Sequence, residues 1–197
     1  LARLDAVVHL AGAGIGDKRW TDAYKRTLLE SRTVTTDLLA RSIAELGGDG
    51  PSVLVSGSAI GFYGDRGDEE LDERSERGSG FLSDICVAWE AATAPAEQSR
   101  CRVAHIRTGI VLSADGGALG KMLPLFKLGA GGRFGNGRQW MSWISIDDEV
   151  RAITHLLTAD VEGPVNLTAP NPVRNREFAA TLAKVLGRPA LLPVVAS

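Results

Sequence analysis

The feature that most constrains this chain is an apolar run that ends in glycines within the first sixteen positions. Residues 6–11 read AVVHLA, and Gly12, Gly14 and Gly16 follow at alternate positions. Strands that are apolar at nearly every position are typical of parallel sheets with both faces covered. We therefore expect residues 6–11 to form a central parallel strand, and a domain that opens on such a strand to lack the segments that normally precede it.

Strand patterns and helix patterns alternate along the rest of the chain. Further strands are expected at 51–59, 102–112, 139–146 and 164–169, and helices at 20–46, 81–96, 117–132, 147–159 and 175–188. We expect Asp147 or Asp148 to cap the fourth of these helices. The alternation predicts an α/β fold with a Rossmann-like, doubly wound parallel sheet. Such sheets bind ligands beyond the carboxyl ends of their strands, so the loops after Leu10, Val55 and Arg107 are the candidate site.

The composition and charge of the chain indicate which classes of binding partner to expect. The 197 residues include 22 basic and 24 acidic side chains, a net charge of -2, without the basic stripe of a nucleic-acid-binding surface. No apolar run reaches the roughly 20 residues that span a bilayer. Cys86 and Cys101 lack neighbours at metal-ligand spacing and are expected to be reduced thiols. We expect a cytoplasmic protein that binds a small molecule, with no metal, nucleic-acid or membrane partner, and a homodimer stays possible.

The glycine loop does not match the dinucleotide fingerprint. That fingerprint needs G-x-G-x-x-G at the start of a helix, where the pyrophosphate sits on the helix N-terminus. Here the glycines are spaced by two, and the helical pattern begins only after Trp20. On spacing alone, this loop is therefore not a phosphate-binding loop.

Several longer motifs, taken together with this loop, indicate a resemblance to a known protein family. DAVVHLAG, LVSGSAIGFYG, HIRTGIVL, WISIDDEVRAI and VNLTAPNP occur in an order that resembles extended short-chain dehydrogenases/reductases. Within that group, DKRWTDAYKRTLLESR and RTGIVLSADGGALGKMLPLFKLGAGGRFGNGRQWMSWI resemble the atypical YfcH-like branch of epimerase/dehydratase proteins. The resemblance implies that residues 1–197 are a partial NAD(P)-binding epimerase domain, with substrate-side segments from about 113 and without its first strands and phosphate loop. It further implies NADP, with NAD possible, and hydride transfer on an unknown substrate.

The resemblance also implies which residues lie against the dinucleotide. In the loop after the first strand, a small or absent side chain would let the backbone approach the cofactor. The alternatives are that Gly12 only turns the chain and that Arg32 is a solvated helix residue. The residues expected at the cofactor are Leu10, Ala11, Gly12, Arg32, Ser56, Thr108, Gly109 and Val111.

Ser58 matches the family's catalytic serine, but its usual partner is missing. Related enzymes carry Tyr-x-x-x-Lys on the next helix, where spacing by four puts the phenol and the ammonium on one face. Here the pair is either Phe81 with Ile85 or Leu82 with Cys86, so both the acid and its cation are absent. Tyr63 is then the remaining titratable candidate for acid-base catalysis, and the alternative is a structural tyrosine.

The substrate side departs from the family as well. Nucleotide-sugar epimerases often carry an arginine that clasps the diphosphate at the position of Met141, so that class of substrate loses its main support. Arg133 and Arg138 flank a nearby glycine loop and are candidate replacements, with Trp143 lining the cleft. Two functions remain open: an atypical oxidoreductase or epimerase, and a non-catalytic dinucleotide-binding redox sensor or scaffold. The absent Tyr-Lys pair favours the second, whereas Ser58 and the tryptophans favour the first.

Overall fold

The structure is a computed structural model that describes residues 1–189, and the chain divides into two compact units. Unit 1 contains Leu1–Thr108 and Arg151–Asn166. Unit 2 contains Gly109–Val150 and the chain from Leu167 on. The predicted strand at 102–112 is therefore divided: residues 102–108 belong to unit 1, and residues 109–112 belong to unit 2.

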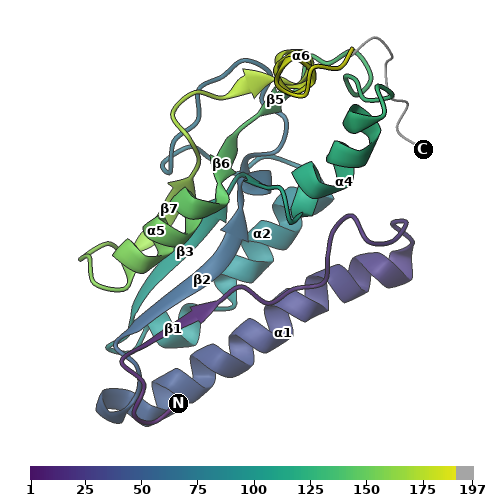
Figure 1. Cartoon of the computed structure of the whole chain (residues 1–197). Helices are drawn as coiled ribbons and strands as arrows, with labels where there is room; N and C mark the ends of the chain where they lie inside the picture. The colour runs from purple at the N-terminus through teal and green to yellow at the C-terminus, as the bar shows by residue number, and fades with distance from the viewer. Residues whose placement is uncertain (190–197) are drawn as a thin grey trace. The chain divides into compact units, whose positions relative to one another are not determined.

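A parallel sheet forms the centre of unit 1 (Figure 1). Its strands lie in the order β1 (Ala6–His9), β2 (Val53–Ala59), β3 (Arg102–Thr108) and β7 (Gly163–Leu167). β2 runs parallel to both β1 and β3, and Ser58 is in register with Arg107. The predicted α/β class with a parallel sheet is confirmed, and the carboxyl ends of the first three strands meet at one edge.

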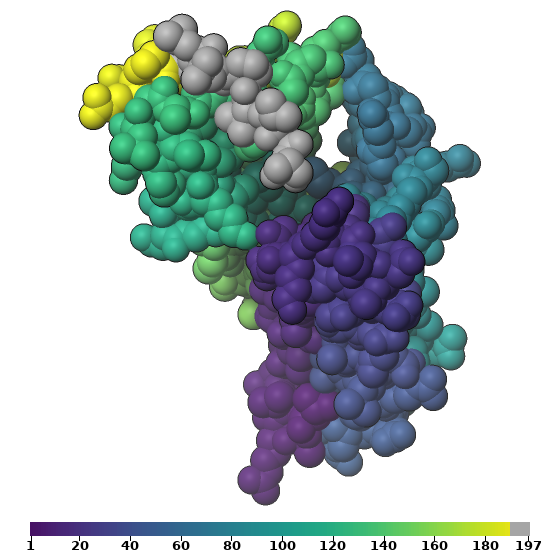
Figure 2. All heavy atoms as spheres, turned by 90° about the vertical axis from the view of Figure 1, so that its right-hand side faces the viewer, coloured from purple at the N-terminus to yellow at the C-terminus, as the bar shows by residue number. Residues whose placement is uncertain are grey.

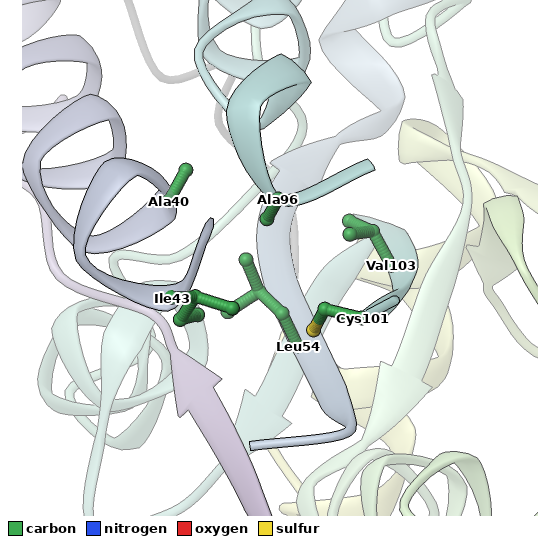
Figure 3. Packing of buried hydrophobic residues seen from close by; sticks show 6 residues of the cluster. All are labelled: Ala40, Ile43, Leu54, Ala96, Cys101 and Val103. Atoms are coloured by element: carbon green, nitrogen blue, oxygen red, sulfur yellow. The ribbon is translucent and has the colours of Figure 1, made fainter. Parts of the chain in front are cut away.

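Three helices pack on one face of this sheet: α1 (Asp22–Leu46), α2 (Phe81–Ala91) and α3 (Ala94–Glu97). The 3-10 turns η1 (Gly47–Asp49) and η2 (Ile60–Tyr63) follow α1 and β2, and α5 (Ile146–Leu156) precedes β7. In Figure 3, side chains from α1, β2, α3 and β3 point toward one another. They form an apolar core of Ala40, Ile43, Leu54, Ala96, Cys101 and Val103. Burial of this core ties the helices to the sheet.

The buried face of α1 carries apolar and polar side chains together. Leu28 and Ile43 are buried, and so are Arg32 and Thr36, whereas Val34 and Leu38 are 61% and 66% exposed. Figure 2 shows the face of unit 1 that α1 forms, in purple and blue. The buried polar side chains have hydrogen-bond partners: Thr36 Oγ1 lies 3.0 Å from the His9 ring and accepts from the Trp89 indole at 3.1 Å.

One prediction about the strands is corrected, and one stays a prediction. Within the described residues β1 lies at the edge of the sheet, and Val8 is 39% exposed; a central place for this strand in a longer domain stays a prediction. The strand predicted at 102–112 is two strands, β3 and β4 (Ile110–Ser113), which belong to different sheets. The break falls at Gly109, where a Cβ atom would lie 2.5 Å from the Ser142 carbonyl oxygen, so only glycine fits there.

Unit 2 contains two small sheets. β4 pairs in parallel with β6 (Trp143–Ser145), and β5 (Trp140–Met141) pairs antiparallel with β8 (Val173–Arg174). The helices are α4 (Gly117–Lys127) and α6 (Asn175–Val185), whose core is formed by Phe126, Ala179 and Ala183. The expected extent of the substrate-side segments, about 113–197, stays a prediction, and residues 190–197 lie outside the described chain.

The start of α5 is also corrected. The Asp148 amide donates to the Ser145 hydroxyl at 3.1 Å, and that hydroxyl donates back to the Asp148 carboxylate at 2.9 Å. Ser145 is therefore the capping residue, and Asp148, three residues on, is its partner.

Candidate functional site

The candidate site is a buried polar network at the carboxyl end of β2. The Ser58 hydroxyl donates to Glu90 Oε1 at 2.6 Å, and Glu90 lies at the end of α2. Arg107, on β3, donates to both carboxylate oxygens of Glu90 at 2.9 Å. Ser58 and Arg107 are 5% and 4% exposed, so the bidentate ion pair is almost fully removed from water.

Tyr63 continues the network from the other side of Arg107. Arg107 Nη1 donates to the Tyr63 hydroxyl at 3.0 Å, and that hydroxyl donates to Asn166 Oδ1 at 2.7 Å. The Asn166 backbone N–H in turn donates to Glu73 Oε1 at 2.8 Å, which ties the loop that carries Glu73, between η2 and α2, to β7. Tyr63 is 4% exposed, and its one proton is directed to Asn166. This geometry favours a positioning role for Tyr63 over the predicted acid-base role.

The charges of the network stabilise one another. Burial alone would raise the pKa of Glu90, but the hydrogen bonds from Arg107 and Ser58 and the charge of Arg107 outweigh it and lower that pKa. Burial opposes the charge of Arg107 too, but its bonds to Glu90 and Tyr63 raise the pKa of the guanidinium further. Both groups are therefore ionised at neutral pH.

The two pairs of residues that could stand in place of the missing catalytic pair have different environments. Ile85 packs in a core cluster with Tyr24 and Leu28, and Phe81 packs against that cluster. Leu82 and Cys86 instead face the turn after β2, where a Cβ atom on Gly61 would lie 3.5 and 3.7 Å from them. Burial, and then the charge of Glu90, raise the pKa of the Cys86 thiol to about 11. A protonated thiol thus lies beside the serine, and a leucine lies one turn earlier on α2.

Two glycines enclose a stack of an arginine and a tryptophan beneath the first glycine loop. The Arg32 guanidinium carbon lies 5.0 Å from the centre of the Trp89 ring. A Cβ atom at Gly12 would lie 3.0 Å from that guanidinium carbon, and one at Gly57 would lie 2.6 Å from the indole. Only glycine fits at Gly57 against the buried indole, whereas a side chain at Gly12 would have to push the guanidinium away from the indole.

Arg32 therefore supports the loop from below. It is 7% exposed, and it donates to the Ala13 carbonyl at 3.0 Å. Ser31 accepts from the Ala13 amide at 3.0 Å, and Tyr24 donates to the Gly14 carbonyl at 2.6 Å. Above these contacts, Leu10, Ala11 and Gly12 are exposed. The alternative of a solvated Arg32 is wrong, because its guanidinium is buried and bonded to backbone.

The remaining predicted cofactor residues divide between the units. In unit 1, Thr108 is half-buried at the end of β3, in register with Ala59. Ser56 has no exposed surface, so in this conformation it cannot touch a dinucleotide, and its hydroxyl has no hydrogen-bond partner within residues 1–189. In unit 2, Gly109 and Val111 are half-buried at the start of β4.

The predicted substrate residues all lie in unit 2. Arg133 and Arg138 are exposed, and Arg133 donates to the Asn136 carbonyl at 3.1 Å. The Trp143 indole donates to the Asn171 carbonyl at 3.1 Å. Met141 is 7% exposed, and its sulfur accepts from Asn175 at 3.2 Å. Arginine at position 141 would therefore bury its charge, so this position cannot simply be converted into a diphosphate clamp.

Sequence reasoning missed the residues that organise the network, namely Glu73, Glu90, Arg107 and Asn166. A usable signal was present for two of them. Arg107 stands in the apolar strand pattern VAHIRT, and Glu90 follows Trp89 near the end of an apolar helix face. A charged residue at a position with buried periodicity needs a partner of opposite charge.

Neither a metal centre nor a membrane span is found in the part of the chain that the structure describes. No three His, Cys, Asp or Glu side chains there are grouped so that they could hold a metal ion. Within the same residues, no helix is both long and apolar enough to cross a membrane.

The fold and the strand-end site define a Rossmann-type α/β domain of the kind found in nucleotide-dependent enzymes. The chain belongs to the NAD dependent epimerase/dehydratase family, whose model matches residues 1–168. It is 46% identical over 199 residues to an epimerase family protein of Mycobacterium bovis, covering 100% of this chain and 65% of that protein. It thus spans about two thirds of the length of that relative.

Two solved structures show the same fold in related proteins. The human epimerase family protein SDR39U1, in a crystal structure with NADPH, is 38% identical with a TM-score of 0.94, over 99% of this chain and 67% of that one. A nucleoside-diphosphate sugar epimerase from Corynebacterium glutamicum is 44% identical with a TM-score of 0.77, over 98% of this chain and 41% of that one.

Proposed function

We propose that this chain carries the nicotinamide side of an NADP(H)-dependent oxidoreductase or epimerase that acts on a small molecule in the cytoplasm, with NAD as a possible second cofactor. The observation that carries the proposal is Ser58, held at the carboxyl end of β2 by the Glu90–Arg107 pair. This is the end of a parallel sheet at which such folds bind their ligands. A homodimer is part of the proposal, and light scattering after size-exclusion chromatography tests it.

The first glycine loop fits a dinucleotide. The Gly12 backbone is bare because Arg32 fills the space that a Cβ would take, and Leu10 and Ala11 are exposed beside it. Leu10, Ala11 and Gly12, with Thr108 at the end of β3, are the residues that would hold the nicotinamide side. When bound, the dinucleotide supplies or accepts hydride. NADPH in the related human structure supports the choice of cofactor.

Within this proposal, Ser58 contacts the substrate and Tyr63 acts through Arg107. The Tyr63 hydroxyl accepts from Arg107 and donates to Asn166, so the phenol holds the guanidinium that in turn holds Glu90. Arg133, Arg138 and Trp143, which lie in unit 2, are proposed as substrate residues because the two arginines flank the glycine loop and could replace the missing diphosphate arginine.

One observation favours a second function, that of a dinucleotide-binding redox sensor. Leu82 and Cys86 occupy the face of α2 beside Ser58. An apolar side chain and a thiol that stays protonated at neutral pH cannot replace a phenol activated by an ammonium. Binding without turnover is the behaviour that this arrangement would give.

Substitution of Ser58 separates the two functions. In the full-length protein, a panel of alcohols and carbonyl compounds is screened by nicotinamide absorbance, and Ser58→Ala should lower kcat by about 100-fold with unchanged NADPH affinity. Ser42→Ala is the matched control, because that hydroxyl donates within α1. Full activity of Ser58→Ala would refute the catalytic assignment. Cofactor binding without turnover of any compound would favour the sensor.

A further inference from the structure

The Ser58 hydroxyl has a fixed polarity. It carries one proton, and an ionised carboxylate can only accept hydrogen bonds. At 2.6 Å from Glu90 Oε1, Ser58 must therefore be the donor in this bond. The short O–H···O contact to a charged acceptor is the stronger kind of hydrogen bond, and it leaves the lone pairs of Ser58 Oγ for any other partner.

Glu90 cannot easily turn away from Ser58. Its two carboxylate oxygens are both held by Arg107, and its side chain is 14% exposed. Arg107 is fixed in turn by Tyr63 at 3.0 Å and by the Phe62 ring, whose centre lies 3.4 Å from the guanidinium carbon. Release of the serine would leave a buried carboxylate oxygen with one charge-assisted bond fewer.

We propose that Glu90 is a positioning residue that fixes Ser58 as a hydrogen-bond acceptor, so that the ligand group seated on Ser58 is a donor, such as a secondary alcohol, and not a carbonyl. This inference rests on the proposed function, which places a ligand at Ser58. A ketone offers only lone pairs and would meet the lone pairs of Ser58 Oγ, whereas an alcohol can donate to them. Sites built around one hydrogen-bond polarity discriminate strongly against a ligand of the opposite polarity.

Ligand binding in dead-end complexes tests the polarity without turnover. The full-length protein is mixed with cyclohexanol and NADPH, or with cyclohexanone and NADP⁺, and affinities are measured by saturation-transfer NMR. Glu90→Gln can donate an amide proton to Ser58 and free the serine proton for the ketone. We expect this variant to reduce the ratio of alcohol to ketone affinity by about 10-fold or more. Glu97→Gln, on α3 and bonded to Thr93, is the matched control and should leave the ratio unchanged.

A second measurement uses the ligand-free protein and does not depend on the folding of Glu90→Gln. The ¹³C resonance of the Glu90 carboxylate is followed in the wild type and in Ser58→Ala, where loss of the donor should shift it and raise the pH at which it titrates. An unchanged resonance and titration would show that the bond is not formed, and would overturn the inference.

The ligand-binding results distinguish a failure of the proposed function from a failure of the polarity assigned to Ser58. If Ser58→Ala leaves both affinities unchanged, no ligand sits on Ser58, and the proposed function fails together with the inference. If Ser58→Ala weakens binding but the wild type prefers the ketone, or Glu90→Gln keeps the wild-type ratio, only the polarity assigned to Ser58 is wrong.

Discussion

At the scale of single residues, the site depends on a buried ion pair whose two charges are visible in the sequence but whose pairing is not. Glu90 and Arg107 come from a helix and a strand that meet only in the folded chain, so spacing along the sequence cannot show that they are partners. Ser58 and Gly12 were predicted because each belongs to a short motif that resembles the family's, and their roles stay predictions. Sequence reasoning therefore finds residues whose role is local, and misses those whose partner is distant in the sequence.

Removal of the Glu90 charge should destabilise the protein at neutral pH. Glu90→Gln leaves Arg107 buried without its counter-ion, at a cost of about 3 kcal/mol in the free energy of unfolding. Because the folded pKa of Glu90 lies below its ordinary value of 4.5, the contribution is present above that value and is lost as the pH falls toward the folded pKa.

Thermal unfolding between neutral and acidic pH measures this difference. The wild type should lose its advantage in unfolding free energy over Glu90→Gln at acidic pH. Both proteins contain the other groups whose charges interact with this carboxylate, namely Arg107, His105 and Cys86, so these groups do not account for the difference. Glu69→Gln is the control, because its partnership with Arg66 is exposed. Equal stability of wild type and Glu90→Gln at neutral pH would contradict the buried pair.

Both thiols should be unreactive in the folded protein. Burial raises the pKa of Cys101, and it raises the pKa of Cys86 to about 11, so almost no thiolate is present at pH 8. Reaction with a disulfide reagent should be slow under native conditions and should reach two thiols per chain in denaturant. Rapid labelling of the native protein would contradict the burial of these cysteines.

At the scale of elements, periodicity predicted most helices and strands but not the polar side chains that α1 buries. Arg32 and Thr36 are buried and bond to the glycine loop and the Trp89 indole, which are distant in the sequence. The split at Gly109 was also missed, since a close approach to the Ser142 carbonyl leaves no signal in hydropathy. Both failures involve contacts between residues that are far apart along the chain, which periodicity does not report.

The capping of α5 gives a test at this scale. Ser145→Ala removes the acceptor for the Asp148 amide and should lower the free energy of unfolding by about 1 kcal/mol. Asp147→Ala, at the other residue that the sequence offered as a cap, should have a smaller effect. Urea denaturation of both variants makes the comparison, and a larger effect of Asp147→Ala would restore the cap predicted from the sequence.

At the scale of the whole molecule, both units contain residues that match the same protein family. The family model runs through unit 1 into unit 2, up to residue 168. Motif order along the chain predicted this family, because each motif lies at the end of a strand or at the start of the next element. The substrate could not be predicted, because the three residues that usually indicate the reaction and the substrate class, the Tyr-Lys pair and the diphosphate arginine, are replaced here by Leu82, Cys86 and Met141.

Calorimetric titration of the full-length protein with NADPH asks whether the first glycine loop takes part in dinucleotide binding. We predict a dissociation constant near 1 μM, or about -8 kcal/mol, because the bare backbone at Gly12 lies at the ligand-binding end of the sheet. Gly12→Ala should weaken binding by about 10-fold or more, since its methyl group would displace Arg32 from Trp89. Gly48→Ala, where a Cβ meets nothing within 4 Å, should bind like the wild type. Absence of NADPH binding, or equal affinity of Gly12→Ala and the wild type, would contradict the account.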